Sequence, residues 1–513
     1  MKLQRLGILL FLQAFCGSLV SLHAQTDSAI SQAIAAGYWD AEEGKERGTI
    51  FTLGTVSVRN PQDSLLDGYS IEPWIGAIAN QKNLISIQDA MQTYLLNHGF
   101  PFATFTSDAK VDSLGRPLVY LTLTLISGDA FKLGGIRTLE TRTRPDVVRR
   151  LGLWKVGEPY SQDRLEQGLT RLRRTGYFES VDRSGLFRDS TRNLLYPSFR
   201  LPDARANRVG GVLGYDSKAP KENRLGGYLD VHLINLFGTA RDFDFGFESR
   251  TQTEREARLA YVEPWLLHLS LGLRLELNYL QQDSSFWEWN RNAVFFQDLG
   301  FKSRVEMGLG LQDNYEAAVP SVSSRRQSEA IQSSIRLIID NRDRVPLTFS
   351  GYRTEIGFTG WRREEGDSSY FVVQSQWSGE TWLPFSQKGG LKLTLRSATN
   401  LPLKGRFNRG ELYTVGGSRS LRGYREREFL TNAYALGDAE FYTWLNRRSR
   451  LFAFISPGLV NRLEGDYYWR QVLGYGAGIE LAKGDWSLAV SYALNPERSF
   501  GDGFLHMRVD NRF

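Results

Sequence analysis

The feature that most constrains this chain is a period-two alternation of apolar and polar residues, which recurs from Asn207 to Phe513. In one segment, Leu271, Leu273, Leu275 and Leu277 alternate with glycine, arginine and glutamate. Successive side chains of a β-strand point to opposite faces, so such segments predict strands with one apolar face and one charged face. A soluble β-sandwich has the same period, and alternation alone leaves that alternative open.

Three further features favour a membrane barrel. The apolar faces recur over about sixteen segments of roughly ten residues, the length with which a tilted strand crosses a bilayer. No helical segment is available to cover them. Short turns such as 235–239 and 483–485 alternate with long polar loops such as 313–328 and 400–433, and all short turns fall on one side. The sequence therefore predicts a transmembrane antiparallel β-barrel of about sixteen strands over residues 205–513.

The last segment, GFLHMRVDNRF, ends the chain on an aromatic residue, and this ending resembles the C-terminal signal of barrel proteins that assembly machinery recognises. An unpaired strand edge in lipid leaves backbone polar groups unsatisfied. We therefore expect this segment to close onto the first barrel strand, near 209–215. The residues predicted to form this seam are Val209, Gly211, Val509 and Phe513.

The N-terminus has the pattern of an export signal. Lys2 and Arg5 precede an apolar stretch, and a small residue, Ala24, marks the expected cleavage site, so residues 1–24 are predicted to be a signal peptide. The single cysteine, Cys16, leaves with that peptide, and the mature chain then has no thiol or disulfide. Residues 25–48 form an N-terminal segment with room for one short helix.

The region between this segment and the barrel reads as two small α+β modules with the same β-α-α-β-β order. Residues 49–128 are the first module, with strands at 51–58, 102–111 and 118–126 and helices at 71–79 and 87–97. Residues 129–204 are the second, with strands at 131–139, 178–185 and 194–201 and helices at 144–151 and 162–174.

Several segments resemble a known family. TRTRPDVVRRLGLWKVGEPYSQDRLEQGLTRLRRTGYFESV, in the second module, resembles a POTRA domain, and AMQTYLLNHGFPFATF is a weaker counterpart in the first. Four barrel segments resemble the BamA/TamA outer-membrane assembly superfamily, namely NLFG at 235–238, YVEPW at 261–265, DNRDRVPLTFSGY at 340–352 and GGSRSLRGYRERE at 416–428. The resemblance implies two POTRA domains in the periplasm and a barrel in the outer membrane.

The resemblance also implies an anchor for the longest external loop. Its motif is here Leu421, Arg422, Gly423 and Tyr424, and the family's arginine folds into the barrel lumen to pair with acidic groups. The implied partner is Glu440, on the next strand. Ser456 stands where the family has a second acidic partner, an aspartate. Asp438, on the same strand face as Glu440, is the alternative partner.

The function that the resemblance implies is outer-membrane protein assembly or translocation. Unfolded outer-membrane or secreted clients would enter through the POTRA domains and insert at the seam. Accessory envelope lipoproteins are further expected partners. Outer-membrane lipids are another, because residues 131–208 carry 17 Lys and Arg against 9 Asp and Glu. A two-partner secretion transporter that exports one dedicated partner, and a plain pore or structural barrel, remain alternatives.

Signatures of enzymes are absent from the sequence. There is no H-E-x-x-H, no G-x-S-x-G and no phosphate-binding loop, and the five histidines are scattered. We therefore predict no catalytic residue, cofactor or metal site, and no nucleic-acid partner for an exported barrel.

Overall fold

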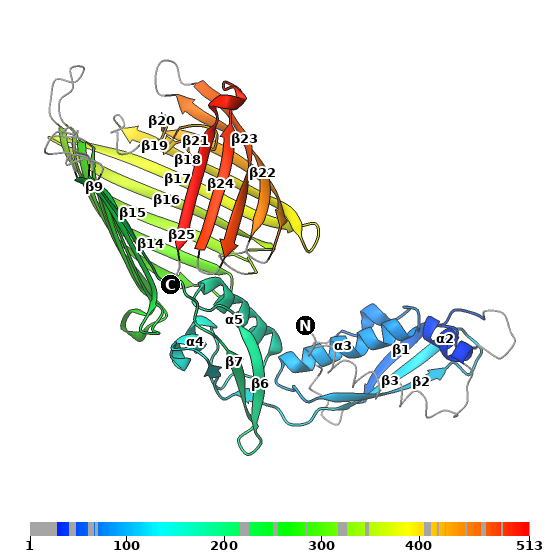
Figure 1. Ribbon diagram of the computed structural model, residues 1–513. Coiled ribbons are helices and arrows are strands. Elements are labelled where there is room, and N and C mark those ends of the chain that lie inside the picture. Colours follow the sequence, from blue (N-terminus) through cyan, green and yellow to red (C-terminus); the bar gives the residue numbers. More distant parts are fainter. Residues whose placement is uncertain are drawn as a thin grey trace. The chain divides into compact units, whose positions relative to one another are not determined.

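The computed structural model of the 513-residue chain describes residues 28–40, 48–59, 66, 70–215, 225–249, 255–282, 286–316, 326–343, 348–404, 412–417, 420–425, 427–446, 449–462, 468–483 and 486–511 (Figure 1). The predicted signal peptide and Phe513 lie outside these ranges. The chain divides into two compact units. Unit 1 holds residues 1–136, 155–166 and 185–197, and unit 2 holds residues 137–154, 167–184 and 198–513.

Unit 1 contains a three-stranded sheet with one long helix. β3 (Leu118–Ile126) lies between β1 (Thr52–Arg59), which runs parallel to it, and β2 (Thr104–Val111), which runs antiparallel. The helix α3 (Gln81–Asn97) buries one apolar stripe in the same core as β1 and β3, at Leu84, Ile87 and Met91. A short helix, α2 (Ser28–Ala36), forms in the N-terminal segment and contacts α3.

The helix predicted at 71–79 is wrong. Only a 3-10 turn, η2 (Glu72–Trp74), forms there, and helical winding ends at Ile75, which is extended with a ψ of 130°, before Gly76 adopts a φ of 84°. The chain continues in an extended form along β1, where the Leu53 amide donates to the Ala77 carbonyl at 2.8 Å. The helix predicted from 87 begins earlier, at Gln81, because the Asn80 side chain accepts from the Asn83 amide as an N-cap.

The second module has the expected order of elements. They are β4 (Lys132–Leu133), β5 (Arg137–Leu139), α4 (Pro145–Leu151), α5 (Gln162–Thr175), β6 (Asp182–Asp189) and β7 (Leu194–Arg200). The single strand predicted at 131–139 is two short strands, and Gly134 lies between them, where a Cβ would come within 2.6 Å of the Tyr196 ring. The two compact units divide this module, so the domain boundaries drawn from the sequence stay predictions.

Unit 2 contains one antiparallel sheet of sixteen strands, which confirms the predicted fold class. Its strands run in order from β8 (Arg208–Tyr215) through β9 (Leu225–Leu236), β10 (Arg241–Ser249), β11 (Arg255–Glu263), β12 (Gly272–Gln282), β13 (Phe286–Asp298), β14 (Ser303–Glu316), β15 (Arg326–Asp340), β16 (Gly351–Glu365), β17 (Ser368–Pro384), β18 (Gly389–Lys404), β21 (Ala433–Trp444), β22 (Arg450–Arg462), β23 (Tyr468–Lys483) and β24 (Trp486–Leu494) to β25 (Phe504–Asn511).

Smaller elements connect these strands. β19 (Tyr413–Val415) and β20 (Phe429–Thr431) form a hairpin between β18 and β21, and the short 3-10 turns η4 (Leu266–His268) and η6 (Phe500–Asp502) lie in other connections. No helix in the described ranges is both long and apolar enough to cross a membrane.

The two faces of the sheet differ as the alternation predicts. The outer face exposes large apolar side chains such as Leu309 and Ile331. The inner face carries ion pairs, among them Arg274 Nη2 to Glu306 Oε2 at 2.9 Å, and Glu306 is buried. A charged inner face and an apolar outer face are the distribution of a transmembrane barrel with a hydrated lumen.

The two ends of the sheet are not joined in the described residues. In residues 208–215 and 504–511, no hydrogen-bonded register pairs β8 with β25, so the seam expected between these strands stays a prediction. Val209 and Gly211 lie in β8 and Val509 lies in β25. These are the shortest strands of the sheet, with eight residues each, and the glycines of β8 offer no side chain for cross-strand packing.

Candidate functional site

The loop between β18 and β21 is held by an apolar cluster. Leu421 and Tyr424 are buried among Val415 in β19, Leu436 in β21 and side chains of β22 and β23. A tight turn precedes them, in which the Ser420 hydroxyl bonds to both the amide and the carbonyl of Gly416. Burial of the side chains on either side of Arg422 therefore fixes the backbone that carries this arginine.

Arg422 lies against carboxylates of β21. Its Nη2 is 2.7 and 2.6 Å from the two carboxylate oxygens of Asp438, and its Nη1 is 3.3 Å from Glu440 Oε2. Its guanidinium carbon is also 3.5 Å from the ring centroid of Phe454, a cation–π contact. The side chain is only 14% exposed, so solvent screens these interactions weakly.

The structure brings the three sequence-predicted partners, Glu440, Asp438 and Ser456, together near Arg422. The expected main partner, Glu440, is not the one with the shortest contacts. Asp438, the alternative partner, makes shorter contacts to Arg422 than Glu440 does. Ser456 takes part as well, since its hydroxyl donates to Asp438 Oδ2 at 2.7 Å. The residue in the family's aspartate position therefore orients a carboxylate instead of supplying one.

Glu440 has a second partner that sequence reasoning missed. Arg450 Nη1 lies 2.7 Å from Glu440 Oε1, and Arg450 Nε lies 2.9 Å from Glu480 Oε2. Two arginines and three carboxylates thus form one chain of ion pairs from Asp438 to Glu480 across β21, β22 and β23. Arg450 is in register with Glu480 on β23 and with Trp444 on β21, the strand that carries Glu440, and the sequence alone does not give this register.

Two glycines allow the loop to approach the sheet closely. Gly423 has a φ of 91°, and a Cβ there would lie 2.3 Å from the Leu494 carbonyl oxygen. A Cβ on Gly474 would lie 1.8 Å from the Arg422 carbonyl oxygen. The Asn495 side-chain amide also donates to the Gly423 carbonyl at 2.7 Å. The role of Gly474 is not visible in the sequence, because the carbonyl that it accommodates lies about fifty residues earlier in the chain.

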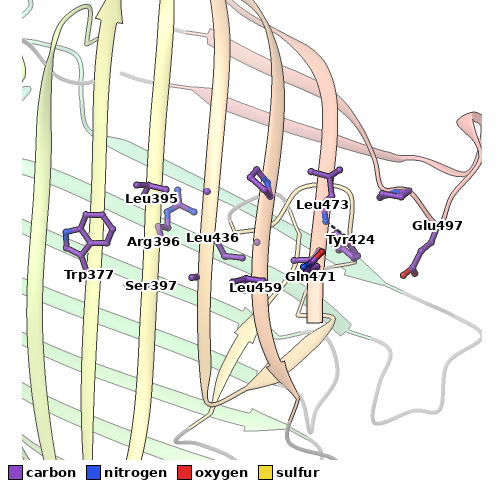
Figure 2. A pocket seen from close by; sticks show the side chains of 16 residues that line it. Trp377, Leu395, Arg396, Ser397, Tyr424, Leu436, Leu459, Gln471, Leu473 and Glu497 are labelled. Carbon is purple, nitrogen blue, oxygen red and sulfur yellow. Dashed lines mark hydrogen bonds between the residues drawn. The ribbon is translucent and has the colours of Figure 1, made fainter. Parts of the chain in front are cut away.

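Tyr424 contacts the edge of β23. The register between β23 and β24 begins only at Tyr475, and the amide of Leu473 donates instead to the Tyr424 hydroxyl at 3.2 Å. Figure 2 shows Tyr424 beside Leu473 and Gln471, where a cavity of about 740 Å³ is lined by residues of β18, β21, β22 and β23. The loop thus supplies a hydrogen-bond acceptor where the neighbouring strand ends.

Two other sequence motifs lie in short connections between strands. One contacts the residues just before α4, and the other contacts α5. In the NLFG turn, the Asn235 side chain donates to the Thr143 hydroxyl at 2.7 Å, and the Gly238 carbonyl accepts from the Arg144 amide at 3.2 Å. A Cβ on Gly238 would lie 2.4 Å from the Arg142 carbonyl oxygen, so this turn requires glycine.

The DNRDR segment is contacted by α5. Arg174 donates to the carbonyl oxygens of Asp340 and Arg342, each at 2.5 Å, and Arg171 pairs with Asp298. Within the segment, Arg342 bonds to Asp340 at 2.7 Å and to Glu380 at 2.8 Å. Burial lowers the pKa of both helix arginines, and the nearby carboxylates of Asp298 and Asp340 act in the opposite direction.

A sixteen-stranded antiparallel sheet with an apolar outer face, a charged inner face and an internal arginine-anchored loop defines an outer-membrane β-barrel with POTRA modules. The chain belongs to the Omp85 superfamily, because residues 235–499 match the Omp85 superfamily domain. Residues 131–196 match the POTRA family described as surface antigen variable number repeat. The resemblance to the BamA/TamA superfamily drawn from the motifs is thereby confirmed.

Solved structures share this fold at low sequence identity. The chain is similar to BamA from Haemophilus ducreyi lacking POTRA domains 1–3, with a TM-score of 0.50 and 16% identity over 90% of this chain and 100% of that one. It is similar to CdiB from Acinetobacter baumannii, with a TM-score of 0.54 and 12% identity over 96% and 100%. CdiB from Escherichia coli gives 0.54 and 13% over 92% of both chains.

Proposed function

We propose that this protein assembles or translocates other proteins at the outer membrane, taking unfolded clients in the periplasm and releasing them at the ends of its sheet. The observation that carries the proposal is the pair of short terminal strands, β8 and β25, which have no register with each other in the described residues. An unpaired strand edge presents backbone donors and acceptors that another chain can use.

Insertion at such an edge would require no particular client sequence. In β-augmentation, backbone hydrogen bonds give the affinity for an added strand, whereas side chains set which client sequences are preferred. Val209 in β8 is 56% exposed, so its strand offers apolar surface together with its edge. The glycines of β8 reduce the side-chain packing that would otherwise hold a permanent neighbour.

The periplasmic module offers a second edge. In the sheet of unit 1, part of β1 is covered by the 76–79 segment, whereas the outer edge of β2 pairs with no strand of the described residues. An extended client can add there as a further strand. The Arg422 anchor has a different role in this proposal, because it holds the loop inside the barrel and stiffens β21 to β23.

Photocrosslinking tests insertion at the edge. A photoreactive amino acid placed at Val209 should capture newly made barrel proteins in living cells. The matched control is Leu309, which is 62% exposed on β14, where both neighbouring strands are paired. Equal capture at the two positions would mean that clients do not prefer the terminal strand, and the proposal would be abandoned.

Client range separates this proposal from the alternatives. Quantitative outer-membrane proteomics after depletion should show loss of many barrel proteins if the protein is a general insertase. Loss of one secreted protein would favour a dedicated two-partner secretion transporter. An unchanged proteome would favour a pore or structural barrel. The feature that motivated the transporter alternative, a helix in the N-terminal segment, is present as α2 and contacts α3 in unit 1.

A further inference from the structure

An apolar groove lies on the outer face of the sheet between β11 and β15. It has a volume of about 590 Å³ and is lined by Leu275, Leu277, Leu309, Leu311 and Ile331. Ala293, on β13, forms its floor, because it is in register with Leu275 on one side and Leu309 on the other. A small side chain between two leucines thus leaves a channel at this point of the outer face.

One arginine lies at the end of this groove. Arg291 is two residues from Ala293 on the same strand and therefore projects from the same face of the sheet. Its register partners are both apolar, Leu277 on β12 and Leu311 on β14. The side chain is 47% exposed, and in the described ranges its ion pair is with Asp313. A guanidinium has five N–H donors, so one carboxylate does not saturate it.

An aromatic belt places this arginine near the membrane interface. One row nearer the long loops, Trp289 is in register with Tyr279, and their ring centroids are 4.6 Å apart. One row further, Trp287 and Tyr315 stack at 6.0 Å. Tryptophan and tyrosine gather at the level of lipid headgroups. Arg291 therefore lies about 7 Å along the strand on the hydrocarbon side of the first aromatic row.

We propose that this groove binds one anionic, phosphate-bearing lipid, with an acyl chain along the leucines and the phosphate on Arg291. Asp313 supplies one counter-charge to Arg291, and the long side chain can extend its remaining N–H donors toward the headgroup level, where the bilayer supplies lipid phosphate. Arginine also matches phosphate geometry with paired donors. The site rests on the membrane-spanning fold and is independent of how clients are handled.

The strands offer a matched control for the charge. Arg362, on β16, is in register with Ile331 and therefore lies in the same row of the outer face as Arg291. It has the same kind of ion pair, to Glu364 at 3.0 Å, and a similar exposure of 58%. It does not line the groove. A general attraction of anionic lipids to basic residues would act on both arginines, whereas the proposed site needs only Arg291.

The experiment is native mass spectrometry of the full-length protein, released from bilayers that contain equal amounts of phosphatidylglycerol and phosphatidylcholine with identical chains. The wild-type protein should retain phosphatidylglycerol preferentially. Arg291→Gln should weaken that retention about tenfold, which corresponds to roughly 1.4 kcal/mol. Arg362→Gln should leave it unchanged. Ala293→Phe, which fills the groove and keeps the charge, should weaken retention as well.

Three results would overturn the proposal. The first is equal retention of the two lipids by the wild-type protein. The second is an equal loss in Arg291→Gln and Arg362→Gln, which would indicate non-specific attraction. The third is full retention in Ala293→Phe, which would mean that no acyl chain occupies the groove. Circular dichroism and heat-modifiable migration confirm beforehand that each variant forms the barrel, and Arg291→Lys, which keeps the charge, should give an intermediate retention.

Discussion

Removal of the Arg422 guanidinium is the perturbation whose outcome the structure specifies most sharply. Arg422→Gln keeps a polar side chain of similar length in the loop and removes the contacts of Nη2 to Asp438 and of Nη1 to Glu440. Among the described residues, Asp438 then keeps the Ser456 hydroxyl as its one side-chain partner, whereas Glu440 keeps Arg450. Most of the cost is therefore expected at Asp438.

The magnitude follows from burial and contact number. Removing one partner of a buried ion pair costs roughly 3–5 kcal/mol, because the other charge is left uncompensated. Asp438 is 23% exposed and retains one hydrogen bond, so we place the loss near the lower limit, at about 3 kcal/mol. Arg422→Lys can keep one contact to Asp438 and loses the one to Glu440, so we expect about half of that loss.

The assay is the free energy of unfolding of the barrel in lipid vesicles, followed by tryptophan fluorescence in urea. A double-mutant cycle of Arg422→Gln with Asp438→Asn should give a coupling energy of about 2 kcal/mol. The same cycle with Glu440→Gln should give a smaller value, because that contact is longer and Glu440 is shared with Arg450.

Two outcomes would refute this reasoning. Additive effects of Arg422→Gln and Asp438→Asn would mean that the two groups do not interact in the membrane-embedded protein. A larger coupling energy of Arg422 with Glu440 than with Asp438 would mean that Glu440 is the stronger partner of Arg422 in the bilayer. A stable barrel that has lost client assembly would instead assign the anchor a role beyond stability.

The remaining predictions address packing, the rim and pH. Gly474→Ala should destabilise the barrel by about 1–3 kcal/mol through overpacking against the loop carbonyl. Gly210→Ala, where an added Cβ would meet no atom of the described residues within 4 Å, should be neutral in the same urea titration. Arg174→Ala should raise hydrogen exchange in the 298–303 and 340–343 segments, and unchanged exchange would show that these bonds are dispensable. The Arg116 guanidinium lowers the pKa of Asp112 to about 2. The stability that this pair contributes is therefore present above pH 4 and is lost as the pH falls through 2. Asp112→Asn should abolish this pH dependence, measured by hydrogen exchange of β2 and β3.

The alternation of residues determined most of the fold. Strand period, segment length and the order of short turns and long loops depend only on neighbouring residues, which is why sixteen antiparallel strands could be predicted from them. The same local signals placed the elements of the second module. They failed at 71–79, where only a 3-10 turn forms and the chain is extended from Ile75 onward. Here backbone hydrogen bonds to the neighbouring strand β1, at Leu53, replace those of a helix.

Which side chains and which strands contact each other was decided only by the tertiary structure. Whether Arg422 meets Asp438 or Glu440 depends on the depth to which the loop enters, and that depth is set by glycines at 423 and 474 and by burial of Leu421 and Tyr424. Whether β8 meets β25 depends on every strand between them, since the small twist between neighbours accumulates across the sheet. Sequence patterns record which face a side chain takes, whereas distances between segments far apart in the chain arise only when the whole sheet is assembled.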